Sequence, residues 1–504
     1  MNYKSTRSSG VKVSSAQAIA QGICGDGGLF VPEILPHFTN ADLTEMQSLA
    51  YTQRAERILS AFLSDFSAEE IKECVTKAYT GGKFDDDLPA PLSKLQNGSA
   101  SMYLLELWHG PTCAFKDMAL QILPHLLTKS LKKINSSKTA VILVATSGDT
   151  GKAALEGFKD VDGTRILVFY PQNGVSPMQK HQMNTQDGEN VSVCAIEGNF
   201  DDAQTGVKKI FTDSKINELL AQNGMLFSSA NSINWGRLLP QIVYYFSAYC
   251  DLLASGELDE KNKEINIVVP TGNFGNILAA YYAKKMGLPV HKFICASNSN
   301  NVLTEFLNTG VYDRNRPFFT TVSPSMDILV SSNLERLLSD LTNGNPVKVA
   351  GWMEELAANG KYQVDEPILK QLKENFYAAC CDDEETKNTI KQIDQIDGYL
   401  CDTHTAVAVN VYQQYLKATK DVDTPAVIAS TASPYKFADS VLNAVSGKVD
   451  SESSEFEKAK ELSKLTGTPI PAPIANLESK KERFSNVCKK DEMSQVVLQM
   501  AGIQ

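Results

Sequence analysis

From residue 139 onward, short runs of consecutive apolar residues alternate with segments that have helical spacing. The clearest runs are 139–146 (TAVILVAT), 265–270 (INIVVP) and 423–430 (DTPAVIAS). A continuous apolar run between turn residues is typical of a strand buried on both faces, as in a parallel sheet covered by helices. The alternation therefore predicts an α/β fold with mostly parallel sheets.

The chain has 504 residues, more than one hydrophobic core usually holds, so we expect two core domains with flanking segments. Residues 1–95 are predicted to form a mostly helical N-terminal domain, and residues 96–445 form the alternating core. Within the core, the more polar stretch 340–400 is predicted to be a helical insertion. Residues 446–504 are predicted to be a C-terminal extension, whose PIPAPI run is extended because proline fixes φ.

Charge and composition exclude several classes of function. The net charge of −11 argues against general nucleic-acid binding, which needs a basic surface. No apolar run approaches the roughly 20 residues of a membrane span, and MNYKSTRSSG lacks the apolar core of a signal peptide. The ten cysteines and six histidines show no metal-ligand spacing, so we expect no metal site. Scattered cysteines are typical of a reducing compartment, and we expect a cytoplasmic protein.

One lysine stands in an unusual setting. Lys116 lies at the centre of HGPTCAFKDMALQ (109–121), after a Gly-Pro turn and next to Phe115, where a helical pattern begins. Most lysines are solvated surface charges. A lysine in apolar surroundings has a lowered pKa, and its neutral amine can attack a carbonyl to form a Schiff base.

Three polar loops follow predicted strands and open helices: ATSGDTG (145–151), PTGNFGN (270–276) and STASPYKF (430–437). An open parallel sheet binds ligands at the carboxyl ends of its strands. The N–H groups at a helix N-terminus bind anions, and glycine lets the backbone approach them closely. Each loop alone could instead be a capped turn, with these caps: Ser147 or Thr150, Asn273, and Thr431.

These loops do not match the usual nucleotide-binding patterns. A P-loop would need glycine at position 146 and Ser or Thr at 153, where Thr146 and Ala153 stand. The dinucleotide pattern would need a glycine two residues after Gly272, where Phe274 stands. A lysine able to form a Schiff base, combined with an anion cradle of another kind, points to pyridoxal phosphate (PLP) as cofactor.

The order of these motifs resembles one known family. HGPTCAFKD, ATSGDTG, SANSINWGRLLPQ, PTGNFGN, SPSMDI and STASPYKF, with YKSTR and GDGGLFVPE near the N-terminus, are similar to the bacterial and fungal branch of threonine synthase. The resemblance runs from about residue 3 to about residue 445. It implies the fold-type II architecture of PLP enzymes, with two α/β core domains and a helical N-terminal domain.

The resemblance also implies roles for individual residues. Lys116 would hold the cofactor covalently and then move protons, and the hydroxyl of Thr431 would bind the pyridine nitrogen. The cofactor phosphate would lie in a cradle of five residues: Gly272, Asn273, Phe274, Gly275 and Asn276. The substrate would be held by five others: Ser147, Asp149, Thr150, Asn231 and Arg237.

The implied reaction converts O-phospho-L-homoserine and water to L-threonine and phosphate. Phosphate would leave from Cγ, water would add at Cβ, and Lys116 would remove and return the protons. The nearest alternative is a related phospho-lyase that releases 2-oxobutyrate from the same or a similar substrate. A non-catalytic α/β binding module is a second alternative, although the presence of Lys116 argues against it. We expect a monomer or homodimer.

Overall fold

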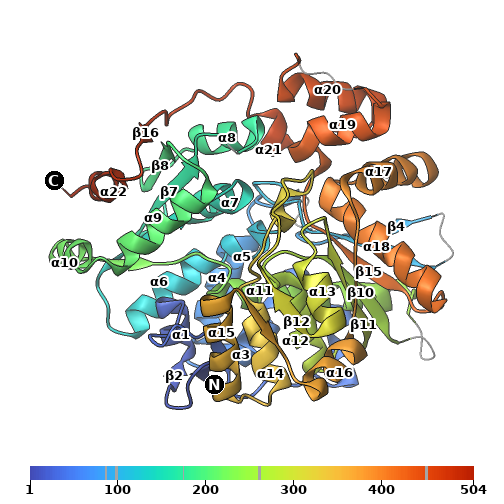
Figure 1. Ribbon diagram of the computed structural model, residues 1–504, viewed down its shortest axis with the longest axis horizontal. Helices are drawn as coiled ribbons and strands as arrows, with labels where there is room; N and C mark the ends of the chain where they lie inside the picture. Colours follow the sequence, from blue (N-terminus) through green and yellow to red (C-terminus); the bar gives the residue numbers. More distant parts are fainter. Residues whose placement is uncertain (86–87, 97–99, 174, 259–262, 449–451, 504) are drawn as a thin grey trace.

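Two mainly parallel sheets carry the fold of this computed structural model, which describes the whole chain except residues 86–87, 97–99, 174, 259–262, 449–451 and 504 (Figure 1). The six-stranded sheet has the order β14 (Phe376–Cys380), β11 (Val290–Ser297), β10 (Ile265–Pro270), β15 (Ala426–Ser430), β5 (Met102–Glu106) and β4 (Leu92–Leu95). Among the described strand pairs of this sheet, only the edge pair β4–β5 is antiparallel. The α/β prediction is confirmed.

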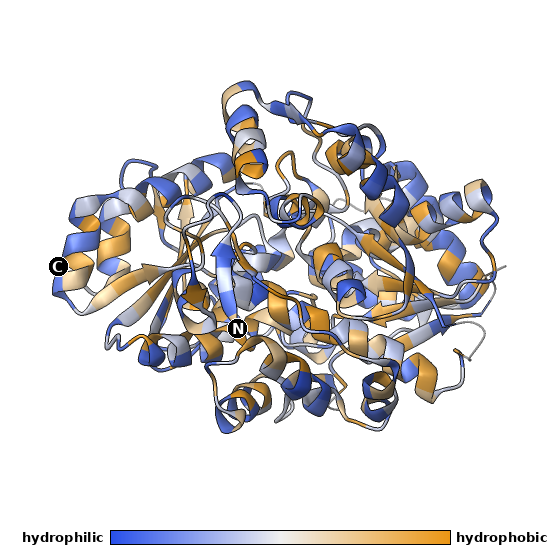
Figure 2. Cartoon of the chain, turned by 90° about the horizontal axis from the view of Figure 1, so that it is seen from below, coloured by the Kyte–Doolittle hydropathy of each residue, from blue (hydrophilic) through white to orange (hydrophobic). Residues whose placement is uncertain are grey.

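The five-stranded sheet is parallel throughout its described strands. Its order is β16 (Val487–Cys488), β8 (Val191–Ile196), β7 (Thr164–Pro171), β6 (Thr139–Ala145) and β9 (Met225–Ser228). The strands are rich in buried apolar residues, and Figure 2 shows them as mostly apolar between helices that carry both apolar and polar residues. This arrangement explains why the strands appear in the sequence as continuous apolar runs.

Helices cover both sheets. Those following strands of the five-stranded sheet are α7 (Asp149–Phe158), α8 (Pro177–Asn184), α9 (Phe200–Thr212) and α10 (Ser214–Gln222). Those of the six-stranded sheet include α12 (Gly275–Lys285), α13 (Val302–Thr309), α14 (Leu334–Leu341), α18 (Thr403–Thr419) and α19 (Ala438–Ser446). The nearly fully buried α11 (Trp235–Ala254) packs against α12, against α5 (Asp117–Leu120) and α6 (Leu123–Lys133), and against the N-terminal helices. No helix within the described ranges is both long and apolar enough to cross a membrane.

The N-terminal region contains strands as well as the predicted helices. Its helices are α1 (Ser15–Gln21), α2 (Asn40–Gln47), α3 (Tyr51–Phe62) and α4 (Ala68–Tyr79). A small antiparallel sheet of β2 (Val13–Ser14), β1 (Asn2–Ser5) and β3 (Phe30–Pro32) accompanies them. These strands are too short to show a clear alternation in sequence. The division of the chain at residues 95 and 445 stays a prediction, although β4 already pairs with the core before residue 95.

We expected the stretch 340–400 to be helical, but it also contains strands. It holds α15 (Pro346–Asn359), α16 (Glu366–Asn375) and α17 (Asp383–Asp397), and β13 (Lys361–Gln363) pairs with β12 (Val311–Asp313). It also supplies β14, which forms the edge of the six-stranded sheet next to β11. As an edge strand, β14 is only partly buried, so its sequence lacks the long apolar run of the central strands.

The C-terminal segment returns to the core. It contains α20 (Glu455–Thr466), α21 (Ala472–Ala475) and α22 (Met493–Ala501), and β16 extends the five-stranded sheet alongside β8 (Figure 1). The PIPAPI run is extended only in its first half. It then turns into the short helix α21, where Pro471 precedes the first turn and therefore interrupts no helical hydrogen bond.

Candidate active site

The lysine loop and the loop after β15 are joined by backbone hydrogen bonds. The Phe115 N–H donates to the Thr431 carbonyl at 2.8 Å, and the Ser433 N–H donates to the Cys113 carbonyl at 3.1 Å. Cys113 has a left-handed backbone with φ of 55°, which is uncommon for a residue other than glycine. These contacts place Lys116 and Thr431 at the same end of the six-stranded sheet.

Lys116 is buried where its loop enters α5, and only 10% of its side chain is exposed. Its Nζ lies 3.4 Å from Ser325 Oγ, 3.7 Å from Asp149 Oδ2, and 4.9 Å from the centre of the Phe115 ring. Burial lowers the pKa of Lys116 to about 8, while the charge of Asp149 opposes that shift. A large fraction of this amine is therefore neutral and nucleophilic at mildly alkaline pH.

A second buried lysine neutralises Asp149. Lys436 is fully buried, and its Nζ lies 2.8 Å from Asp149 Oδ1 and donates to the Thr112 carbonyl at 2.8 Å. Gln179 Nε2 also donates to Asp149 Oδ1 at 2.9 Å. Burial alone would raise the pKa of Asp149, but the positive charges of Lys436 and Lys116 hold that pKa well below its usual range. Asp149 is thus a carboxylate between two lysines.

The role of Asp149 in substrate binding stays a prediction, and its carboxylate is already engaged by two lysines. Ser147 and Thr150 lie in the same loop, the former exposed and the latter half-buried, with no side-chain hydrogen bond to the described residues. Asn231 is exposed at the start of the NSINWGR segment. These three side chains are accessible to a substrate.

The loop 270–276 is not a simple capped turn. Phe274, which precedes α12, has a left-handed backbone with φ of 62° and provides no side-chain cap. No acceptor for the backbone N–H groups of residues 273–276 is found among the residues that the structure describes. The start of α7 is partly capped, because Thr146 Oγ1 accepts from the N–H groups of Gly148 at 3.0 Å and Gly151 at 2.9 Å, and only the N–H groups of Asp149 and Thr150 have no acceptor within the described residues. The start of α12 therefore presents the more open set of N–H groups for an external anion.

Two further features of the 270–276 loop fit the predicted anion cradle. The Asn276 Oδ1 accepts hydrogen bonds from Tyr244 and Tyr245, whereas its buried Nδ2 has no partner in the described part of the chain. Gly272 lies so close to Ser325 that a Cβ atom at this position would be 2.6 Å from the Ser325 carbonyl oxygen. The loop thus presents a spare buried donor beside a glycine that no other residue could replace without displacing Ser325.

Arg237 is buried in the first turn of α11. Its guanidinium donates to the Ala230 carbonyl at 2.8 Å, and its Nε has no hydrogen-bond partner within the described residues. Burial lowers the pKa of Arg237 to about 10, which still leaves it protonated at neutral pH. Its charge also lowers the pKa of Lys116, so the two side chains are electrostatic neighbours. No carboxylate in the described ranges pairs with it.

Thr431 does not cap the following helix. Ser433 holds that position and accepts from the Tyr435 N–H, while no hydrogen bond of the Thr431 hydroxyl is found in the described chain. The Tyr435 hydroxyl donates to the Thr468 carbonyl in the C-terminal segment. The hydroxyl of Thr431 is therefore available to a ligand next to the lysine loop.

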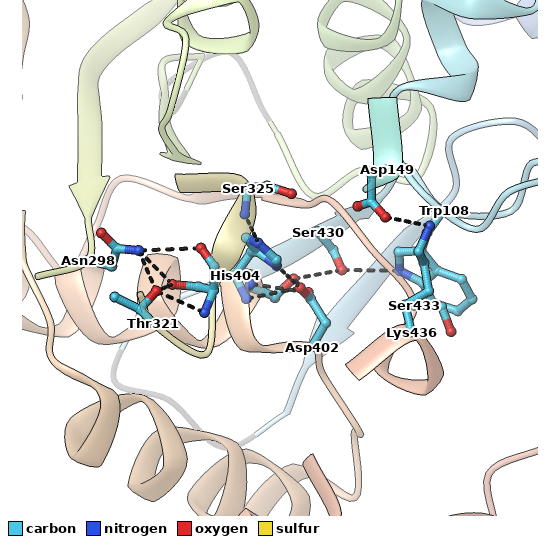
Figure 3. Close-up of polar contacts among 12 residues, drawn as sticks. Trp108, Asp149, Asn298, Thr321, Ser325, Asp402, His404, Ser430, Ser433 and Lys436 are labelled. Atoms are coloured by element: carbon cyan, nitrogen blue, oxygen red, sulfur yellow. Dashed lines mark hydrogen bonds and ion pairs between the residues drawn. The ribbon is translucent and has the colours of Figure 1, made fainter. Parts of the chain in front are cut away.

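Several site residues were missed as functional residues in the sequence. Lys436 and Ser325 lie inside the recognised motifs STASPYKF and SPSMDI but had no assigned role. His404 and Asp402 were not noticed, although an Asp before an apolar helix is a recognisable cap. Figure 3 shows how Asp402, His404 and Ser325 form one hydrogen-bonded chain, with the Asp149–Lys436 pair beside it. No cluster suited to a metal ion occurs among the described residues.

Comparison with family models gives three consecutive matches. Residues 2–79 match "Threonine synthase N terminus", residues 85–430 match "Pyridoxal-phosphate dependent enzyme", and residues 405–497 match "Threonine synthase, C-terminal". Among solved structures, the PLP-bound threonine synthase of Brucella melitensis has a TM-score of 0.86 at 35% identity, covering 99% of both chains. Yeast threonine synthase has a TM-score of 0.87 at 35% identity, covering 99% of this chain and 98% of its own.

Curated relatives fall into two groups. The threonine synthase of Saccharomyces cerevisiae is 37% identical over 92% of this chain and 93% of its own length, and that of Pseudomonas aeruginosa is 38% identical over 96% and 95%. The human threonine synthase-like 1 is 40% identical over 88% of this chain, which spans only 59% of that protein's length.

Proposed function

The chain belongs to the threonine synthase family of PLP-dependent enzymes, and we propose that it converts O-phospho-L-homoserine and water to L-threonine and phosphate. The family's fold-type II architecture agrees with the two parallel sheets described above. Within this family, the proposal depends on how the site binds a phosphorylated amino acid and on which product it forms.

The observation that carries the proposal is the burial of the Arg237 guanidinium without a carboxylate partner among the described residues. A buried guanidinium without a carboxylate partner is costly, so it implies an anionic ligand. Arginine binds phosphate through two parallel hydrogen bonds, and the unpaired Nε can supply one of them. The exposed Asn231, six residues earlier, would add an amide donor. Arg237 and Asn231 are therefore our candidates for holding the anionic end of the substrate.

The residues of the site also fit PLP. The uncapped start of α12, with N–H groups at 273–276 and the spare Nδ2 of Asn276, would hold the cofactor phosphate. Lys116 would hold its aldehyde carbon, and the free hydroxyl of Thr431 would face its ring nitrogen. When bound, PLP withdraws electrons from the α-carbon of the substrate.

Lys116 would carry the proton transfers. Its amine is close to half neutral near pH 8, so it can accept a proton from the substrate and return it. The Asp149–Lys436 pair keeps a compensated charge beside it, and the buried lining limits access of bulk water. Ser147 and Thr150 would bind the substrate carboxylate with hydroxyl and N–H donors at the start of α7.

One assay tests the function. The purified protein is given PLP and O-phospho-L-homoserine, and threonine, phosphate and 2-oxobutyrate are all measured. Threonine equal to the phosphate released supports the proposal. Phosphate with 2-oxobutyrate and no threonine would instead identify the phospho-lyase alternative, and no visible absorbance band and no turnover would identify a binding module. The cytoplasmic location and the monomeric or homodimeric state stay predictions.

Replacing Thr431 by aspartate is expected to slow threonine formation and to increase long-wavelength absorbance. A carboxylate beside the ring nitrogen favours its protonation, which strengthens electron withdrawal and delays phosphate loss from the substrate. Steady-state rates and absorbance spectra with substrate measure both effects. Ser433→Ala, which removes the actual cap, serves as the control: it should cost about 1 kcal/mol of stability with a normal spectrum. Normal catalysis in Thr431→Asp would remove Thr431 from the site.

Replacing Lys436 by methionine is expected to move the acid limb of the kcat–pH profile upward by on the order of one pH unit. Burial lowers the pKa of Lys116 most, and the positive charge of Lys436 lowers it further. Without Lys436, that pKa rises, and the neutral amine appears only at higher pH. Lys152 is a matched control, because it is also buried and paired, with Glu156. An unshifted profile in Lys436→Met, or an equal shift in Lys152→Met, would contradict the prediction.

A further inference from the structure

Ser325 lies between the lysine and the phosphate cradle. It is the middle residue of a short 3₁₀ turn, η2 (Pro324–Met326). Its Oγ is 3.4 Å from Lys116 Nζ, and its carbonyl oxygen lies against Gly272. The position of Ser325 therefore determines whether a hydroxyl group lies next to the Lys116 amine.

The imidazole of His404 accepts a hydrogen bond from the backbone of this turn. Its ring is 2% exposed, and its Nε2 lies 3.1 Å from the Ser325 backbone nitrogen (Figure 3). The Nδ1 of His404 lies 2.7 Å from a carboxylate oxygen of the fully buried Asp402. A carboxylate can only accept here, so Nδ1 carries the hydrogen and Nε2 is left as the acceptor for the Ser325 N–H.

The dyad is itself fixed in place. Asp402 caps α18, accepting from the N–H groups of His404 at 2.9 Å and Thr405 at 3.1 Å. The Thr405 hydroxyl is 3.1 Å from Ser430 Oγ, at the end of β15, and the Phe437 ring packs against the imidazole. His404 therefore has no freedom to turn away from Ser325.

We propose that His404 is a positioning residue, which holds Ser325 so that the Ser325 hydroxyl is the neutral partner of the Lys116 amine. The inference rests on the proposed function of Lys116. The amine has two polar neighbours, and they act in opposite directions: the carboxylate of Asp149 favours the ammonium form, whereas a hydroxyl can also donate to the lone pair of a neutral amine. Ser325 would thus keep the released amine away from Asp149 and ready to accept a proton.

The charged groups around Lys116 set the background for this effect. Besides Asp149, the positive charges of Lys436 and Arg237 and the carboxylate of Asp117 act on it. None of these changes when Ser325 or His404 is replaced, so a shift in the titration of Lys116 can be assigned to the lost contact.

The test compares PLP-loaded variants. Ser325→Ala and His404→Leu are each expected to lower kcat at pH 7 roughly tenfold, which corresponds to the loss of about one hydrogen bond. The KM should change by less than about twofold. Both should move the acid limb of the pH profile, and the visible absorbance titration of the lysine-bound cofactor, to higher pH. His404→Gln, which keeps an acceptor for the Ser325 N–H, should recover most of the loss.

The double variant Ser325→Ala/His404→Leu is decisive, because a residue that acts only through Ser325 should add no further loss of kcat in the Ser325→Ala background. His125→Leu, at a half-buried histidine of α6 outside the site, controls for a general effect on folding. The proposal is overturned if His404→Leu only lowers the Tm, leaving kcat, KM and the titration unchanged, or if the losses add. If His404→Leu does not fold, a normal pH profile in Ser325→Ala overturns it.

The absorbance titration needs no substrate, so these outcomes are distinct from a failure of the proposed function. In that case the unmodified protein itself would form no threonine or would show no lysine-bound cofactor.

Discussion

Lys116→Ala is expected to abolish turnover, with a loss of roughly 10³-fold or more, because it removes both the covalent hold on the cofactor and the proton carrier. Borohydride, which fixes an imine irreversibly, should no longer attach PLP to the protein. The measurement is the mass of the borohydride-treated protein, together with the rate of threonine formation. The fold should persist, since the loop remains bonded to residues 431 and 433 through its backbone.

Lys116→Arg tests whether the site requires the lysine amine itself or only a positive charge. Arginine keeps a positive charge next to Asp149, but it stays protonated and cannot form the imine. It should therefore be as inactive as the alanine variant. If either variant still traps PLP covalently at this position and forms threonine at a normal rate, the assignment of Lys116 is wrong.

Gly272→Val is expected to weaken PLP binding by roughly 100-fold, about 2.7 kcal/mol. A Cβ atom at this position meets the Ser325 carbonyl at 2.6 Å, so either the cradle or the 3₁₀ turn must move. Both contact the place where the cofactor phosphate would bind. Equilibrium binding of PLP to the cofactor-depleted protein measures the loss, and circular dichroism establishes that the variant is folded.

Gly275→Ala distinguishes a clash with bound PLP from a clash within the protein. The nearest neighbour of an alanine Cβ here is the Asn333 side chain, at 3.4 Å, so the protein itself accommodates it. Reduced PLP affinity would then report the close approach of the phosphate to the start of α12. Gly351→Ala in α15, which has open space around it, is the matched control. Unchanged affinity in both folded loop variants, Gly272→Val and Gly275→Ala, would remove this loop from the cofactor site.

The strands that carry the site could be predicted because each is buried on both faces. The run 265–270 coincides with β10, and the runs ending at 146 and 430 differ from β6 and β15 by a few residues at their ends. The three loops followed from this, since parallel strands present their carboxyl ends at one edge. The dry setting of Lys116 was also readable, because its apolar neighbours are adjacent in sequence.

The contacts between loops could not be predicted. Lys436 and Asp149 are far apart in the sequence, and nothing local shows that both are buried and paired. The left-handed backbones of Cys113 and Phe274 oppose the local preference of those residues, and such conflicts are concentrated where a site requires them. His404 was missed because its role depends on a turn 79 positions away.

The place of β15 in the sheet has a consequence for biosynthesis. The lysine loop follows β5 and the phosphate cradle follows β10, and in the described sheet these two strands are joined only through β15. While the ribosome has yet to release residues 426–430, a nascent chain carries both halves of the site without the strand that unites them. We therefore expect cofactor capture only after β15 has been synthesised, and a chain truncated before residue 426 should not bind PLP through Lys116.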